Sequence, residues 1–164
     1  YFDTELLLAA SCTNDDVVAY YDGALHVVPL HADIRQSVIH EYTHHVLISR
    51  GFLGPTWAQE GIAMYVARET WWRTPHWLAR VADTPFGLED MEQGIPYTMR
   101  PDQAVLFYVQ SAAMVACAVG GEPEGIAGLV RSVYGERRHG ELSYELPQLA
   151  GPSEWSACLG SLQP

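Results

Sequence analysis

The chain has 164 residues, of which 48% are hydrophobic, and its formal net charge is −11 at pH 7. This composition can supply the core of one globular domain of ordinary size, so we expect a single domain over 1–164. The acidic balance repels polyanions and excludes nucleic acid as an expected partner. The most apolar stretch, Ala104 to Val119, is interrupted by Gln110 and Ser111. It falls short of the roughly 18 residues of a membrane span, so no span is predicted.

Other features of the sequence leave the cellular location open. The chain begins with Tyr1 and has no charged start followed by an apolar stretch, which we interpret as removal of an upstream part. The small number of basic residues and of cysteines permits an extracytoplasmic location. Cys12 and Cys158 are candidates for a disulfide, whereas Cys117 lies in a helical apolar pattern and is expected to be a buried small side chain.

The N-terminal third predicts strands followed by one helix. Apolar and β-branched residues between Asp16 and Leu30 flank the turn dipeptide Asp22-Gly23, which indicates a β-hairpin. The spacing then becomes helical, with Asp33 favouring the helix start and Gly51 its end.

The remainder of the chain is expected to be mostly helical. Thr56 and Gln59 have the spacing of a capping box at the start of a second helix, and Pro85 to Tyr97 is expected to be a loop. The predicted helices are Thr56 to about Trp72, a short one from Pro75, Pro101 to Gly120, Glu122 to Tyr134, and Ser153 to Leu159. Strands before helices predict an α+β fold. Its β-rich part covers about 1–50 and includes the first helix, and its helical part covers 51–164.

His40, Glu41 and His44 form the pattern H-E-x-x-H on the first predicted helix. Residues four apart on a helix point in nearly the same direction, so both imidazoles can reach one metal ion. Glu41 is displaced from that direction and suits a general base that takes a proton from water. The pattern therefore predicts a metal-dependent hydrolase.

Glu60 is the candidate for a third ligand. It lies near the start of the second predicted helix, which a short reversal brings back toward the first. Gly61 is expected to leave room beside the metal, and Ala63 to allow close helix packing.

The pairing of H-E-x-x-H with the downstream W-x-x-E-G-x-A at Trp57 to Ala63 resembles the gluzincin peptidases, including the compact minigluzincins. The resemblance implies a small zincin-like domain with an N-terminal β-sheet, in which Zn²⁺ is held by His40, His44 and Glu60. It also implies hydrolysis of peptide bonds by water that Glu41 activates. A tyrosine commonly stabilises the oxyanion in such enzymes; Tyr108 is our candidate and Tyr97 the alternative.

Two departures from better-known relatives bear on this interpretation. Position 64 is Met64, so the aspartate that orients a ligand histidine in thermolysin-like enzymes is absent there. The segment Gly-x-Met-Glu-Asn, by which aminopeptidase-N-like enzymes grip a free amino terminus, is also missing, since Met91-Glu92-Gln93 neither matches it nor lies in that place. We therefore expect an endopeptidase that acts on a peptide or protein substrate.

Two other interpretations stay open at this stage. The chain could be a catalytically inactive zinc-binding interaction module, or its histidines could be purely structural. The tryptophans are expected in the core, although exposed ones would favour apolar substrate side chains. The oligomeric state and the substrate preference are not readable from the sequence.

Overall fold

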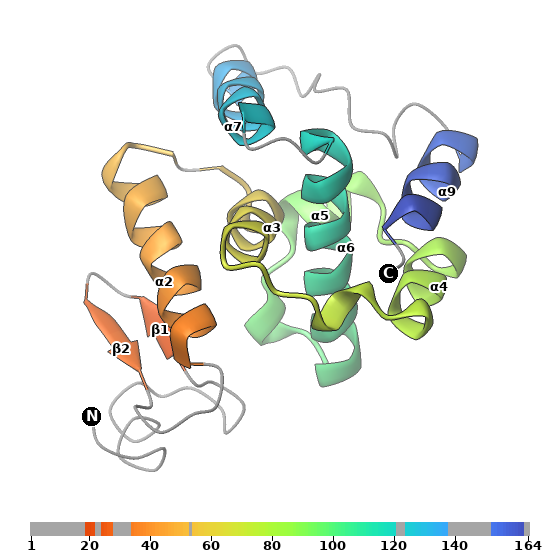
Figure 1. Ribbon diagram of the computed structural model, residues 1–164, viewed down its shortest axis with the longest axis horizontal. Coiled ribbons are helices and arrows are strands. Elements are labelled where there is room, and N and C mark those ends of the chain that lie inside the picture. The colour runs from red at the N-terminus through yellow and green to blue at the C-terminus, as the bar shows by residue number, and fades with distance from the viewer. Residues whose placement is uncertain are drawn as a thin grey trace.

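The computed structural model describes residues 19–21, 24–27, 34–52, 54–120, 124–137 and 152–162. These segments are almost entirely helical, and Figure 1 shows the helices side by side with one small hairpin next to α2. The predicted α+β fold is wrong, because the two strands found in the described segments have three residues each and pair only with each other, which makes no layer. Helices packed on helices build the described core.

The hairpin itself is where the sequence predicted it. Strands β1 (Ala19–Tyr21) and β2 (Leu25–Val27) are antiparallel, with Tyr20 opposite His26. Both strands contact α2 (Figure 1). Strand and turn signals are local and identify such a hairpin correctly, but they do not say whether further strands join it into a sheet. Most of the predicted β-rich part before residue 34 lies outside the described residues.

Helices α2 (Ile34–Ser49) and α3 (Thr56–Val66) form a helical hairpin. The end of α2 agrees with the prediction, since Gly51 has a φ of 78° and its N–H donates to the Ile48 carbonyl at 2.9 Å. Glycine adopts this left-handed conformation without the steric cost that a side chain imposes. The chain then reverses at Pro55, and α3 packs against α2.

Helix α3 differs from the prediction at both ends. The capping box at Thr56 does not form, because Pro55 is the N-cap and no side chain caps the helix. The helix ends at Val66 rather than near Trp72, since Arg68 turns into the left-handed region with a φ of 57°. Apolar spacing continues beyond Val66, so the sequence carries no stop signal at this point.

Helix α6 (Pro101–Val119) is the central helix and ends as predicted at Gly120, which has a φ of 64°. It contacts α3, α4, α7 and α9, and nearly all its side chains from Leu106 to Ala116 are buried. Among the described helices it is the one long and apolar enough to cross a membrane by length and composition, and 61% of that apolar window is buried in the fold. Its position in the core accounts for its composition.

The close approach of α3 to α6 depends on Gly61. A Cβ built on Gly61 would lie 2.6 Å from Val115 Cγ2 and nearer still to the Ser111 carbonyl oxygen. Carbon atoms in favourable contact are about 3.5–4.0 Å apart, so a side chain does not fit. Gly61 thus makes room for α6, whereas its place in the motif predicted room beside a metal. Ala63 is fully buried, as expected for close helix packing.

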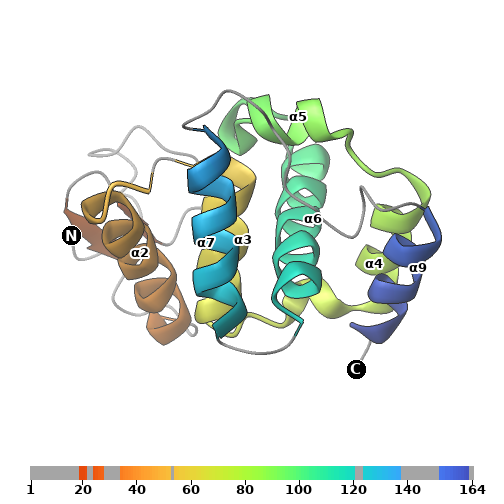
Figure 2. The same cartoon turned by 90° about the horizontal axis from the view of Figure 1, so that it is seen from above.

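The other helices surround α6. They are η1 (Trp71–Arg73), α4 (Pro75–Asp83), α5 (Leu88–Gln93), η2 (Pro96–Thr98), α7 (Glu124–Arg137) and α9 (Pro152–Ser161). Figure 2 shows α2, α3, α6 and α4 following one another across the molecule. The expected loop from Pro85 to Tyr97 instead contains α5. The buried Gln110 amide of α6 fixes the segment before α5. It accepts a hydrogen bond from the Phe86 N–H at 2.8 Å and donates one to the Phe86 carbonyl at 2.9 Å.

A disulfide joins Cys117 of α6 to Cys158 of α9, with Cα atoms 6.0 Å apart. The candidate pairing of Cys158 with Cys12 is therefore excluded, and Cys117, expected to be a buried small side chain, is half-buried and bonded. Cys12 lies outside the described residues. The sequence placed Cys117 on a helix correctly. It could not reveal that α9 packs against α6 and brings the second sulfur to it.

Candidate metal centre

Three side chains from α2 and α3 converge between the two helices. His40 and His44 lie one turn apart on α2, and Glu60 lies near the start of α3. One ligand atom from each lies within 4.8 Å of the other two. The group could hold a metal ion, and among the described residues it is the one cluster of histidine, cysteine and carboxylate side chains that could. The fold thus brings the predicted ligand set together.

A single carboxylate oxygen faces both imidazoles. Glu60 Oε2 lies 3.2 Å from His40 Nε2 and 3.6 Å from His44 Nε2. The two rings are 4.9 Å apart and inclined by 65°. The side chains of His40, His44 and Glu60 are 14%, 12% and 17% exposed, so the group is reachable from solvent.

The charges in this group stabilise one another. Burial lowers the pKa of His40, but hydrogen bonds with Glu60 and Glu69 and the charges of both carboxylates outweigh it and raise the pKa to about 10. Burial raises the pKa of Glu60, whereas hydrogen bonds and charge interactions with His40 and His44 lower it to about 2. Without a metal, a protonated His40 therefore bridges two ionised carboxylates at neutral pH.

Glu41, the predicted general base, lies directly beside the ligands on α2. Burial raises its pKa; the neighbouring His40 and His44 lower it, and Glu60 and Glu69 raise it again, with a net rise above the usual value. A carboxylate with a raised pKa accepts a proton more readily, as general-base chemistry near neutral pH requires.

Tyr108, the predicted oxyanion-stabilising residue, lies on α6. Burial raises its pKa well above the ordinary value, and so do the charges of Glu60, Glu41 and Glu69. The phenol therefore stays protonated and can donate a hydrogen bond. The side chain of Tyr97, the alternative, lies outside what the structure describes.

Glu69, which the sequence did not indicate, is a further residue of the site. Its Oε1 lies 2.7 Å from His40 Nδ1, on the side of the ring opposite Glu60. Nine positions separate Glu69 from Glu60, and the left-handed turn at Arg68 lies between them. Neither helical spacing nor a known motif connects the two residues, so no sequence signal could have assigned Glu69 to the site.

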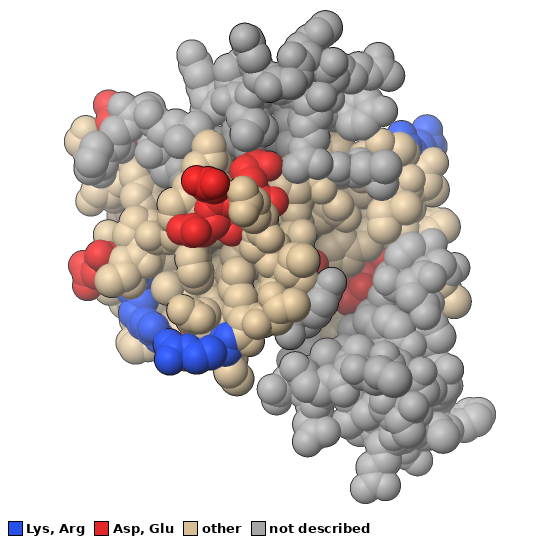
Figure 3. All heavy atoms as spheres, turned by 180° about the vertical axis from the view of Figure 1, so that it is seen from behind, with Lys and Arg blue, Asp and Glu red and all other residues tan. Residues whose placement is uncertain are grey.

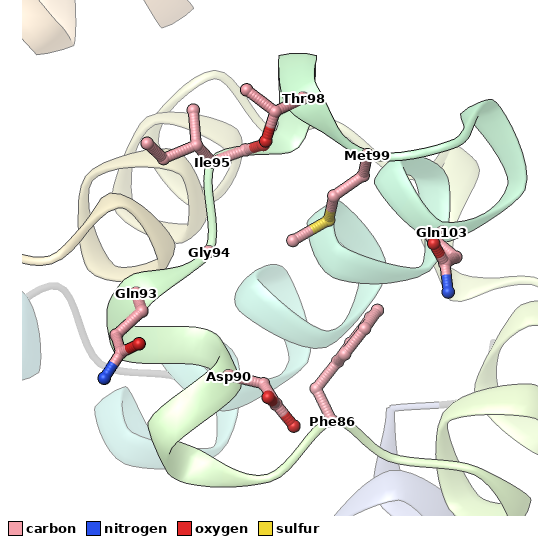
Figure 4. Close-up of a pocket in the computed structure, with 8 residues that line it drawn as sticks. All are labelled: Phe86, Asp90, Gln93, Gly94, Ile95, Thr98, Met99 and Gln103. Carbon is pink, nitrogen blue, oxygen red and sulfur yellow. The ribbon is translucent and has the colours of Figure 1, made fainter.

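A pocket in the described part of the chain lies away from these residues. It has a volume of about 500 Å³ and is lined by residues between Phe86 and Gln103, from α5, η2 and the start of α6 (Figure 4). Asp90 is the one acidic or basic side chain of its lining, and no residue of the metal group contributes to it. Ligand chemistry, rather than a pocket, therefore identifies the candidate site.

Acidic and basic side chains are unevenly distributed over one face of the molecule. On the face drawn in Figure 3, aspartate and glutamate side chains gather toward the middle, while arginines lie toward the edges. This distribution agrees with the net charge of −11 and favours the approach of cations over anions.

Comparisons of the chain with models of protein families, with curated proteins and with solved structures gave no match. Residue chemistry and geometry therefore carry the functional argument.

Proposed function

We propose that this protein is a zinc-dependent peptidase of the gluzincin type that cleaves within polypeptide chains. The observation that carries the proposal is the convergence of His40, His44 and Glu60, with ligand atoms within 4.8 Å of one another. The H-E-x-x-H and W-x-x-E-G-x-A motifs, which resemble those of gluzincins, support it. The missing amino-terminus-binding segment favours an endopeptidase over an aminopeptidase.

The donor set suits zinc. Zn²⁺ binds imidazole nitrogen and carboxylate oxygen at about 2.0–2.2 Å, so ligand atoms around a tetrahedral ion lie about 3.3–3.5 Å apart. The separations of 3.2 and 3.6 Å between Glu60 Oε2 and the two Nε2 atoms are close to this spacing. Two imidazoles and one carboxylate also form a catalytic type of ligand set, which keeps a coordination position for water or substrate.

Each residue has a distinct role in the proposed reaction. A bound zinc ion would supply Lewis acidity, polarising the peptide carbonyl and making water nucleophilic near neutral pH. Glu41 accepts a proton from the attacking water and returns it to the leaving amine. Tyr108 donates a hydrogen bond to the oxygen that gains negative charge. No covalent bond to the protein is formed.

The variant Glu41→Gln tests the catalytic part of this proposal. It keeps the shape of the side chain but removes its basicity, so kcat/KM toward a denatured protein should fall by about 10²–10⁴-fold while zinc stays bound. The variant Glu154→Gln makes the same change on the exposed surface of α9 and should cleave like the wild type. Mass spectrometry of the products distinguishes internal cleavage from trimming. A wild type that binds zinc but cleaves no unfolded protein would indicate the inactive zinc-binding module.

Elemental analysis tests the metal part. The wild type purified without chelators should contain about one zinc per chain, as a site with a single ligand set requires. His44→Ala should lose the metal, whereas His76→Ala, on the exposed surface of α4, should retain it. A wild type without zinc, both as purified and after reconstitution, would show that the histidines are structural.

A further inference from the structure

Glu69 links the metal group to an exposed tryptophan. Its Oε1 lies 2.7 Å from His40 Nδ1, and its Oε2 accepts a hydrogen bond of 2.9 Å from Trp71 Nε1. Each carboxylate oxygen thus has a partner of its own, which restricts rotation of the Glu69 side chain. The His40 ring is held between two carboxylates, with Nδ1 toward Glu69 and Nε2 toward Glu60.

The backbone that carries Glu69 is strained. Arg68 has a φ of 57°, the one positive φ found at a non-glycine residue in the described chain. The turn ends α3 with two hydrogen bonds, from the Arg68 N–H to the Tyr65 carbonyl at 3.1 Å and from the Glu69 N–H to the Met64 carbonyl at 3.0 Å. Glycine usually occupies this place in such a helix end, because a side chain makes the conformation costly.

Helix α2 holds this turn from the other side. Gln36 Nε2 donates to the Arg68 carbonyl at 3.1 Å. Gln36 lies one turn before His40, so α2 supplies both the side chain that fixes the turn and the imidazole toward which the turn directs Glu69. Strained residues persist where surrounding contacts over-determine them, and they concentrate at functional sites.

We propose that Glu69 is the positioning residue of the metal centre, an inference that rests on the zinc site proposed above. The Glu69 carboxylate accepts a hydrogen bond from the Nδ1–H of His40. This contact fixes the ring orientation and the tautomer of His40 and leaves the Nε2 lone pair for the metal. It takes the role of the aspartate that the family resemblance would place at position 64, where this chain has Met64. Because Met64 is fully buried in the core, that position cannot serve the ligand.

The affinity of the full chain for Zn²⁺, measured by competition with a chelating dye, tests the proposal. Glu69→Ala should bind Zn²⁺ about 10–100-fold more weakly than the wild type, the usual effect of removing a group that orients a ligand. Glu69→Gln keeps the side-chain shape but not the charge, and should be weakened about 10-fold, at the low end of this range. Glu89→Ala is the matched control, since Glu89 also accepts a side-chain hydrogen bond, from Gln93 on α5, and should bind like the wild type.

Substitution with Co²⁺ provides a readout that a merely structural role would not move. The visible absorption of bound Co²⁺ reports ligand geometry, so it should change in Glu69→Ala and stay the same in Glu89→Ala. Arg68→Gly should retain the wild-type Zn²⁺ affinity, because glycine adopts the turn without strain and leaves Glu69 in place. Loss of affinity in Arg68→Gly would contradict the role of the turn.

The outcomes separate this inference from the proposed function. If the wild type binds Zn²⁺, and Glu69→Gln binds it with equal affinity and an unchanged Co²⁺ spectrum, the positioning role is overturned while the zinc site stands. This comparison also decides the matter if Glu69→Ala does not fold. If the wild type binds no Zn²⁺, the proposed function is overturned, and the positioning role falls with it.

Discussion

Replacing Gly61 with alanine tests whether α3 and α6 approach each other as closely as the structure shows. The added methyl would lie 2.6 Å from Val115 Cγ2, about 1 Å inside a normal carbon–carbon contact, and also against the backbone of Ser111. A backbone obstacle cannot move aside by a change of rotamer, so α3 must shift. Glu60, the neighbouring residue, would shift with it.

The expected loss of stability combines two opposing effects. Overpacking a core costs about 1–3 kcal/mol, or more against a rigid obstacle. The better helix propensity of alanine returns about 0.5–1 kcal/mol. Because the obstacle is backbone, the upper end of the overpacking cost applies, and the net destabilisation of Gly61→Ala should be about 2–2.5 kcal/mol, which for a chain of this size lowers Tm by about 4–10 °C.

Thermal unfolding followed by circular dichroism measures this effect. Gly128→Ala is the matched control, because Gly128 lies in α7 and an added Cβ would meet no atom within 4 Å. It should be stabilised by about 0.5–1 kcal/mol. If Gly61→Ala proved as stable as Gly128→Ala, the tight approach of the two helices would be refuted.

Two further predictions concern the protonation of His40, and a third concerns the disulfide. The pKa of His40 is raised from 6.5 to about 10, so the stability that protonated His40 contributes to the metal-free protein is full below pH 6.5 and is lost as the pH rises through 10. Thermal unfolding in the presence of a chelator should therefore show Tm falling between pH 6.5 and pH 10. Zn²⁺ needs a neutral imidazole, so its binding at pH 8 should release about one proton from His40. Calorimetry in two buffers of different ionisation enthalpy measures this release. If no proton were released, His40 would not be protonated in the metal-free protein. Removing the Cys117–Cys158 disulfide by the double change to serine should lower the free energy of unfolding by about 2–4 kcal/mol in denaturant titrations, since the bond closes a long loop. An unchanged unfolding midpoint would exclude a stabilising role for it.

The predicted helices show which information is local. Gly51 and Gly120 end α2 and α6 as predicted, because a glycine in the left-handed conformation stops a helix without help from other segments. The end of α3 was misjudged because Arg68 takes this conformation under tertiary contacts. The expected sheet failed for a related reason: a hairpin signal says nothing about additional strands.

The sequence by itself determined the candidate metal ligands and the helix that presents two of them. Side chains four positions apart share a helix face in any fold, so His40 and His44 could be paired before the structure was known. Only the tertiary structure decided how Glu60 approaches them, that Glu69 stands behind His40, that Gly61 admits α6 and that Cys117 meets Cys158. Each of these contacts joins segments that are distant along the chain or separated by a turn, and their proximity depends on how the helices pack.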